Sequence, residues 1–450
     1  MNALVLAALF FTSLGCTYFK GVRWAFPFAM LPALLLFFQT VGVGIPMIPD
    51  VNAISAVTYG ALLGILIKGG EPLGIRWCFT DTAVVALASV YVASSLVHYD
   101  TWEGVSAGGN RVLTYLGPYF MGRVALRDAE VRLWSLRVMC GIALFLLPLA
   151  MIEWRMRPYF LSRILENDVG LIKAFNDQTY ERWGFFRTIL TFSHPIDSGN
   201  VMTMVTALIV GFAYSTGRTL TSDKFVFAGF VAAAICAFTA MSFTTFMVIA
   251  IGLAMVFALR TVPWLGQAAW VPVLLGVLGF VVMTSILLGM ELVKPDDADS
   301  SFDGSLYMRM LIVQTVFDTA ISSGPLGAGE NFKFEDLFMN SIDNAYLLML
   351  LQQGWVYLLI FLALPFLLAL DVGRALQGVP ATDARLPLIV SFSALVAMMA
   401  GMYTVWFGFA YASVWMVMLG LTTSMAHFVQ DRAAVTAPQG FAVGMRPAIA

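Results

Sequence analysis

Residues 345–370 read AYLLMLLQQGWVYLLIFLALPFLLAL, an apolar stretch without a charged side chain. As a helix it is long enough to cross the roughly 30 Å of hydrocarbon in a bilayer. The stretch closely follows Asp343, and Asp commonly caps the first turn of a helix. It predicts a transmembrane helix that begins near residue 345.

The composition extends this prediction to the whole chain. Of the 450 residues, 60% are hydrophobic and only 12% are charged, and the mean hydropathy is +0.84. Such a composition is typical of a protein that uses lipid as its solvent. The net charge of −2 provides no basic field, which disfavours a nucleic-acid partner.

Thirteen apolar runs are long enough, or nearly so, to be membrane spans. They lie near 4–19, 24–43, 52–67, 78–98, 110–126, 134–153, 198–217, 225–240, 243–260, 270–292, 345–370, 386–407 and 409–428. The run at 110–126 also fits a re-entrant segment, because it carries Arg111 and Arg123, and the run at 4–19 is short. We therefore predict an all-α polytopic membrane protein with about 12–13 transmembrane helices, in which residues 1–450 form a single integral membrane domain.

The basic residues of the short loops predict the orientation. In a thirteen-span chain they share one face, which the positive-inside rule assigns to the cytoplasm; they are Lys20, Arg23, Lys68, Arg76, Arg127, Arg132, Arg218, Lys224, Arg260, Arg374 and Arg385. The tail at 429–450 falls on the same side. The two longest loops, about 153–197 and 294–342, then lie together on the opposite side.

Loops of this length are usually functional. The first has no net charge, whereas residues 294–343 carry three basic and nine acidic side chains, a net charge of −6. Within the second loop, apolar residues at helical spacing predict a helix over 305–322 that lies at the membrane surface. Gly324 and Pro325 end it, and Arg309 in its first turn lies at the level of the lipid headgroups.

Arg187 is the candidate binding residue of the first loop. It stands in the pattern Arg187-x4-Phe192-x-His194-Pro195-Ile196 before the next span. A guanidinium at the membrane edge can bind a phosphate in two places, although an arginine that simply extends to the headgroups has the same spacing. His194 has no second His or Cys at metal-ligand spacing, so we interpret it as a helix cap and not as a catalytic residue.

Asp343 has two open interpretations. It can cap the helix that begins near 345, or it can act as a base where the second loop meets the membrane. An ordinary Asp pKa of about 3.9 makes it a weak base near neutral pH.

The sequence predicts no metal and no cofactor. The acidic run Asp297-Ala298-Asp299-Ser300-Ser301-Phe302-Asp303-Gly304 resembles the start of a calcium loop, but counting from Asp299 places Met310 at the twelfth, closing position. The cysteines Cys16, Cys78, Cys140 and Cys236 lie in apolar runs without metal-ligand spacing.

Two stretches resemble the O-antigen ligase and O-antigen polymerase superfamily of bacterial membrane glycosyltransferases. They are the Arg187 pattern above, and Arg309 followed by Pro325-Leu326-Gly327-Ala328-Gly329 and Asn344-x-Tyr346-Leu347-x6-Gly354. The resemblance covers about 185–365. It implies an inverting, metal-independent transfer of a glycan from undecaprenyl diphosphate to an acceptor hydroxyl, on the periplasmic side of the bacterial inner membrane.

The resemblance also implies roles for particular residues. Arg187 and Arg309, with Arg182 nearby, would hold the diphosphate. Ligases of the family usually have a histidine base directly before Asn-x-Tyr-Leu, and this chain has Asp343 there. The difference favours the polymerase branch.

We therefore predict an exopolysaccharide or O-antigen repeat-unit polymerase. Its partners would be an undecaprenyl-diphosphate-linked glycan, an acceptor glycan and the lipid bilayer; whether a chain-length regulator binds is left open by the sequence. The acidic second loop favours a neutral or weakly charged glycan.

A ligase that moves a finished glycan to a lipid or protein is the alternative enzyme. A flippase or secondary transporter is the alternative of another class, although its charged residues would more naturally lie near the bilayer midplane.

Overall fold

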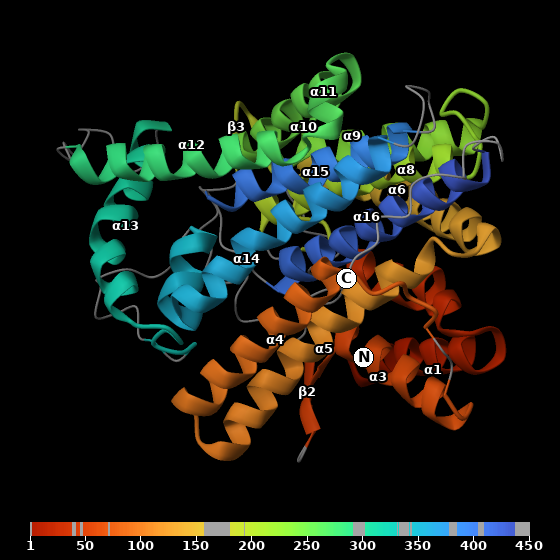
Figure 1. The fold of residues 1–450 in the computed structure, drawn as a ribbon, viewed down its shortest axis with the longest axis horizontal. Helices are drawn as coiled ribbons and strands as arrows, with labels where there is room; N and C mark the ends of the chain where they lie inside the picture. Colours follow the sequence, from red (N-terminus) through yellow and green to blue (C-terminus); the bar gives the residue numbers. More distant parts are fainter. Residues whose placement is uncertain are drawn as a thin grey trace, which may run out of the picture.

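The computed structural model describes residues 2–37, 42–45, 48–70, 73–156, 181–192, 194–290, 302–330, 332, 342, 344–377, 385–403 and 409–436. It is an all-α membrane protein (Figure 1). The described helices are α1 (Asn2–Lys20), η1 (Val22–Trp24), η2 (Phe26–Met30), α2 (Leu31–Leu36), α3 (Ala53–Ile67), α4 (Phe79–His98), α5 (Thr101–Ala125), α6 (Ala129–Met156), α8 (Pro195–Ser215), α9 (Lys224–Thr239), α10 (Phe243–Thr261), α11 (Pro263–Gln267), α12 (Trp270–Gly289), α13 (Phe302–Ser322), α14 (Ala345–Gln377), α15 (Leu386–Met402) and α16 (Phe409–Thr436).

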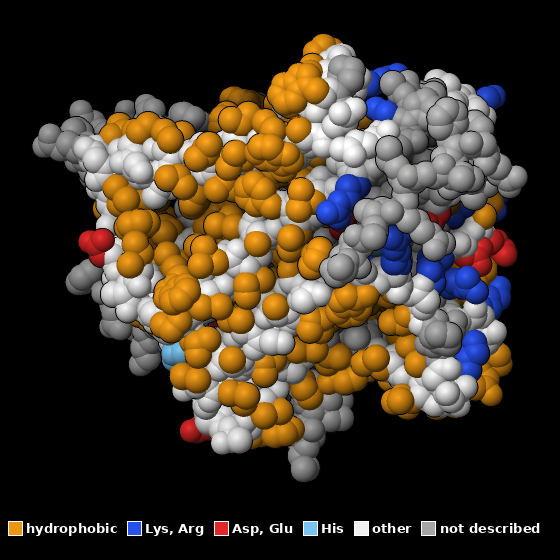
Figure 2. Space-filling view, in the orientation of Figure 1, with side chains coloured by type: hydrophobic (Ala, Val, Ile, Leu, Met, Phe, Trp, Pro, Cys, Tyr) orange, Lys and Arg blue, Asp and Glu red, His pale blue; other side chains and the backbone are white. Residues whose placement is uncertain are grey.

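The helices confirm the predicted polytopic fold. In the described part of the chain, eight helices are long and apolar enough to cross a membrane, and four shorter apolar segments cover 22–36, 53–67, 224–239 and 386–402. With α5 they correspond to the thirteen predicted spans. Large apolar side chains such as Phe19, Leu66 and Phe257 are exposed around them, and hydrophobic atoms cover much of the face in Figure 2. This surface suits contact with lipid.

The two arginines of α5, Arg111 and Arg123, do not make it a re-entrant segment. It is one continuous helix of 25 residues. Arg123 is buried in an ion pair with Asp81 of α4, and Arg111 pairs with Glu330 of the second loop. Because each guanidinium has a carboxylate partner, the helix can carry both charges through the protein interior.

Basic side chains gather at one end of the molecule, on the right in Figure 2. Contacts link the segments at this end: Arg23 pairs with Asp128, Arg123 donates to the carbonyl oxygen of Arg76, and Arg127 donates to that of Leu73. We call it the basic end. It contains the last turns of α5, α14 and α16 and the start of α4. Helix α16 continues to Thr436, so the tail predicted from about 429 begins too early.

We call the opposite end of the bundle the outer end; it holds the last turn of α6 and the first turns of α8 and α10. Two short hairpins accompany the helices: β1 (Gly42–Ile45) pairs with β2 (Ile48–Asn52), and β3 (Glu181–Arg182) pairs with β4 (Phe185–Phe186). The second hairpin leads directly into the chain around Arg187.

The predicted helix of the second loop is confirmed as α13. Its apolar face, with Val313 and Val316, packs on Leu347 and Leu351 of α14, and α12, α13 and the first part of α14 lie together at the left of Figure 1. The helix is therefore held by α12 and α14 as well as by any membrane surface.

The glycine-rich segment after α13 completes a break in α14. Gly354 has φ 85°, which interrupts the helix, and a Cβ there would lie 2.3 Å from the carbonyl oxygen of Pro325. Across the break, Ala328 N–H donates to the Leu351 carbonyl at 2.7 Å, and Gly329 N–H donates to that of Gln352 at 3.0 Å. The segment after α13 is therefore a turn whose N–H groups are bound to the backbone of α14.

Candidate functional site

Arg187 is buried at the outer end. The residue follows β4 in the chain, is only 6% exposed, and donates from Nε to the carbonyl oxygen of Ala240 at 3.2 Å. The next residue, Thr188, binds this segment to the end of α9, because its N–H donates to the Thr239 carbonyl at 3.2 Å. An arginine that simply extends to the headgroups would be exposed, so that interpretation is wrong.

Glu153, in the last turn of α6, holds the segment that follows Arg187. Its carboxylate is 1% exposed, and Oε2 accepts the N–H groups of Ile189 at 3.0 Å and Leu190 at 2.9 Å. Leu190 has φ 57°, which lies in the left-handed region of the backbone map that residues other than glycine rarely adopt. The carboxylate therefore satisfies two backbone donors of a sharply turned loop, a role that the sequence did not reveal.

Arg182 lies beside the same helix connection. It belongs to β3, and its Nη1 donates to the carbonyl oxygen of Met241 at 3.3 Å. Met241 directly follows Ala240, the residue that accepts from Arg187. Both guanidinium groups are thus anchored on consecutive carbonyls between α9 and α10.

His194 confirms the predicted helix cap. It is the N-cap of α8, and its Nδ1 accepts the N–H of Ile196 at 3.2 Å. Burial, followed by the positive charges of Arg187 and Arg182, lowers the pKa of His194 to about 3. The imidazole is therefore neutral near pH 7, and because Nδ1 is the acceptor, its proton is assigned to Nε2.

The site stands where helix N-termini meet. α8 begins at Pro195 and α10 at Phe243, and the two helices touch closely: Thr245 Oγ1 donates to Asn200 Oδ1 at 3.2 Å. Helix N-termini carry a partial positive charge and suit anions. Arg182, Arg187 and neutral His194 add hydrogen-bond donors at the same place, so the arrangement can bind an anion such as a phosphate.

Arg309 belongs to α13, which comes later in the sequence than the elements that hold Arg182, Arg187 and His194. It is partly exposed on α13, which packs on α12 and α14. The described geometry brings Arg182, Arg187 and His194 together. The pairing of Arg187 with Arg309 stays a prediction.

Asp343 lies outside the described residues, as does most of the acidic run at 297–304. The cap of α14 is nevertheless clear, because Asn344 Oδ1 accepts the N–H groups of Tyr346 and Leu347, each at 3.1 Å. The cap that the structure describes is thus one residue after the position that the sequence offered for it. Asp343 as a base stays a prediction.

One helix links the start of α14 to the outer-end site. Tyr346 donates its hydroxyl to the Met399 carbonyl at 2.7 Å, and Tyr411 of α16 donates to the Met398 carbonyl at 3.0 Å. Both carbonyls belong to α15, which also contacts α8 and α10. The first turn of α14 is thus tied to α15, which also packs on α8.

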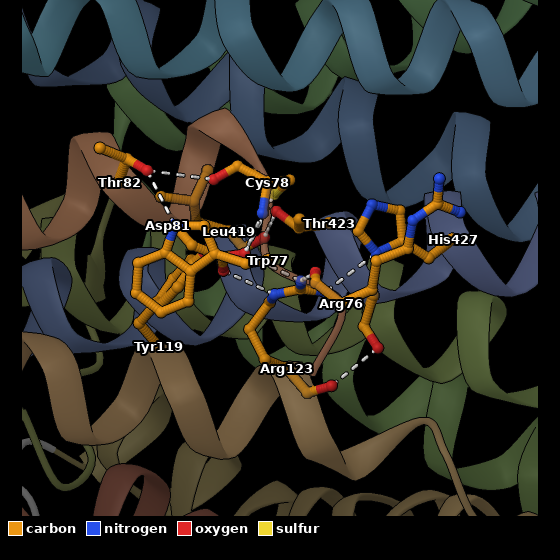
Figure 3. Close-up of polar contacts among 11 residues, drawn as sticks. Arg76, Trp77, Cys78, Asp81, Thr82, Tyr119, Arg123, Leu419, Thr423 and His427 are labelled. Atoms are coloured by element: carbon orange, nitrogen blue, oxygen red, sulfur yellow. Dashed lines mark hydrogen bonds and ion pairs between the residues drawn. The ribbon is translucent and has the colours of Figure 1, made fainter. Parts of the chain in front are cut away.

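A second polar cluster lies at the basic end (Figure 3). Arg123 donates from Nε to Asp81 Oδ1 at 2.8 Å and from Nη2 to Asp81 Oδ2 at 3.0 Å, and Tyr119 donates to Asp81 Oδ1 at 2.7 Å. Cys78 and His427 point toward the same centre in Figure 3. The residues of this cluster come from parts of the chain as far apart as Arg76 and His427, so the spacing of residues in the sequence does not reveal it.

Comparison with models of known protein families and with characterised proteins gives no match to this chain. The fold and the two polar clusters therefore carry the functional argument.

Proposed function

We propose that the protein is a membrane glycosyltransferase that transfers a glycan from a lipid-linked diphosphate to an acceptor sugar hydroxyl, as a repeat-unit polymerase of the bacterial inner membrane. The observation that carries the proposal is the group formed by buried Arg187 and the half-buried side chains of Arg182 and neutral His194 near the N-terminus of α8. The motif resemblance around Arg187, Arg309 and Asn344 adds the class of reaction.

The chemistry suits these residues. In the transfer, the bond between the anomeric carbon and the diphosphate oxygen breaks, and a new bond forms to the acceptor oxygen. The leaving diphosphate gains negative charge, which Arg187 and Arg182 would stabilise in place as preorganised donors. Nε2–H of His194 would add a neutral donor without repelling either arginine.

The acceptor hydroxyl must lose its proton as it attacks from the opposite face of the anomeric carbon. Asp343 would receive this proton, at the point where the second loop enters α14. Arg309 on α13 would hold the diphosphate from the side of the second loop. In this proposal both long loops would contact one substrate.

The intramembrane charges support an enzyme over a carrier. Arg123 pairs with Asp81, and Arg111 pairs with Glu330 while its Nε donates to the Tyr91 hydroxyl at 2.9 Å. Such pairs hold helices together, whereas a carrier needs ionisable groups that bind and release along its path.

Deleting the gene and analysing the carrier lipid tests the proposal. Accumulation of single repeat units is the expected result. Long chains stranded on the lipid would instead indicate a ligase, and single repeats that are inaccessible from outside would indicate a flippase.

Site variants test the residues. We expect Arg187→Ala to abolish polymer, and Arg187→Lys to restore only part of it, because an ammonium cannot form two parallel bonds to a phosphate. Polymer length is read on gels, and exposed Arg137→Ala at the far end of α6 is the matched control. Wild-type polymer in both Arg187→Ala and Arg182→Ala would refute the site.

A further inference from the structure

Three side chains with metal-binding atoms meet at the basic end, far along the helices from the outer-end site. Cys78 precedes α4, Asp371 lies near the end of α14, and His427 lies near the end of α16. One ligand atom from each lies within 4.8 Å of the other two. Three separate elements thus offer a thiol, a carboxylate and an imidazole to a common point.

The surrounding polar residues form a hydrogen-bonded framework that does not depend on the side chains of Cys78, Asp371 and His427. Asp81 accepts from Arg123, from Tyr119 and from the N–H of Cys78 at 2.8 Å. Arg123 also donates from Nη2 to the Arg76 carbonyl at 2.7 Å. The buried charges of Asp81 and Arg123 are therefore satisfied among themselves and the backbone.

The side chains of the three potential ligands have few polar contacts of their own. His427 Nδ1 lies 3.5 Å from Arg123 Nη1, and Cys78 Sγ lies 3.1 Å from Asp81 Oδ2. Asp371 is 8% exposed, and its buried Oδ2 accepts no hydrogen bond from the described residues; its Oδ1 lies 3.5 Å from Nη1 of exposed Arg374. A cation could replace these contacts while Asp81 and Arg123 keep their stronger bonds.

We propose that Cys78, Asp371 and His427 bind a divalent transition-metal ion of the zinc class. Sulfur, nitrogen and carboxylate oxygen together are the ligands of Zn²⁺, whereas Mg²⁺ and Ca²⁺ prefer oxygen alone. A thiolate and a carboxylate neutralise the two charges of the ion, and binding releases the thiol proton. The ion would join α4, α14 and α16 and leave one coordination position for water.

Cobalt provides the direct test, because a thiolate bound to Co²⁺ gives a near-ultraviolet charge-transfer band. Full-length protein in detergent, stripped with a chelator, is titrated with Co²⁺ and then with Zn²⁺. We expect one Co²⁺ per chain with a thiolate band, which Zn²⁺ then removes. Absence of the band in the wild type would overturn the proposal.

Variants identify the ligands. Cys78→Ser should remove the band, and Asp371→Asn and His427→Gln should each weaken binding at least about tenfold. The buried thiol of Cys236 in α9 gives the matched control, Cys236→Ser, which should bind as the wild type does. Unchanged Co²⁺ binding by Cys78→Ser would refute the assignment.

A measurement on the wild type covers the case in which a ligand variant fails to fold. Zn²⁺ should slow alkylation of Cys78 at least about tenfold, because a metal-bound thiolate is protected, while alkylation of Cys16 in α1 stays unchanged. Mass spectrometry of the peptides reads both rates. Equal alkylation of Cys78 with and without Zn²⁺ would refute the site.

Discussion

Replacing Glu153 tests whether its carboxylate holds the loop of the outer-end site. Oε2 accepts two backbone N–H groups at 3.0 and 2.9 Å, and the group is buried. A hydrogen bond to a charged group contributes about 1.5 kcal/mol or more, so Glu153→Ala should raise the free energy of the folded loop by about 3 kcal/mol. Because about 1.4 kcal/mol is a factor of ten, the amides of Ile189 and Leu190 should exchange roughly 100-fold faster.

Hydrogen exchange read by mass spectrometry on the peptide that contains residues 189 and 190 measures this effect. Glu153→Gln should give a smaller increase, because the amide oxygen can still accept both N–H groups without the charge. Glu130→Ala, at the exposed start of the same helix, is the control and should leave the exchange unchanged. We also expect Glu153→Ala to shorten the polymer through displacement of Arg187. Wild-type exchange in Glu153→Ala would show that the carboxylate does not hold the loop.

Three further predictions concern the loops and the break in α14. In the folded state burial lowers the pKa of His194 from 6.5 to about 3. Below pH 6.5 the unfolded state therefore binds more protons than the folded state, and the free energy of unfolding falls by about 1.4 kcal/mol per pH unit. The variant His194→Asn keeps a helix cap, so its melting temperature should vary less than that of the wild type between pH 7 and 5. Gly354→Ala should destabilise by about 3 kcal/mol or more, read as a lower melting temperature, whereas Gly276→Ala in α12, with open space around it, should not. Asp343→Asn should keep the melting temperature, because Asn344 caps α14, but lose polymer; retained polymer would show that Asp343 is not the base.

The membrane helices could be predicted from the sequence because lipid imposes a simple rule on them. A span must be long and apolar, and all backbone groups must bond within it. The helix around 78–98 follows this rule closely, and α13 follows from its apolar periodicity. The helix around 345–370 departs from the rule at Gly354, where carbonyl groups bond to the segment after α13 instead. The sequence predicted an early end for α16 because the last turns of this helix contain polar residues that are also typical of a tail.

The site could be predicted only in part, because its contacts depend on neighbours that are distant in the sequence. The Arg187 and His194 motif marked the correct loop, and the cap role of His194 needs only local spacing. The support from Glu153 crosses from α6 to another segment, and the cap of α14 moved from Asp343 to Asn344 because only the actual backbone turn decides which side chain reaches the N–H groups.

Arginines lie inside the protein at both ends of the molecule, and those at the outer end lie close to the imidazole of His194. Arg123 lies against the carboxylate of Asp81, so its charge is neutralised within the protein. Arg182 and Arg187 each donate to a carbonyl oxygen. Burial, followed by the charges of Arg187 and Arg182, lowers the pKa of His194, so positive charge lies close to that imidazole. Groups whose pKa is strongly perturbed occur often at binding and catalytic sites. An incoming diphosphate would neutralise this field and should raise the pKa of His194 toward its ordinary value. NMR of the imidazole in the presence of a lipid diphosphate measures that pKa, and an unchanged value would place the anion elsewhere.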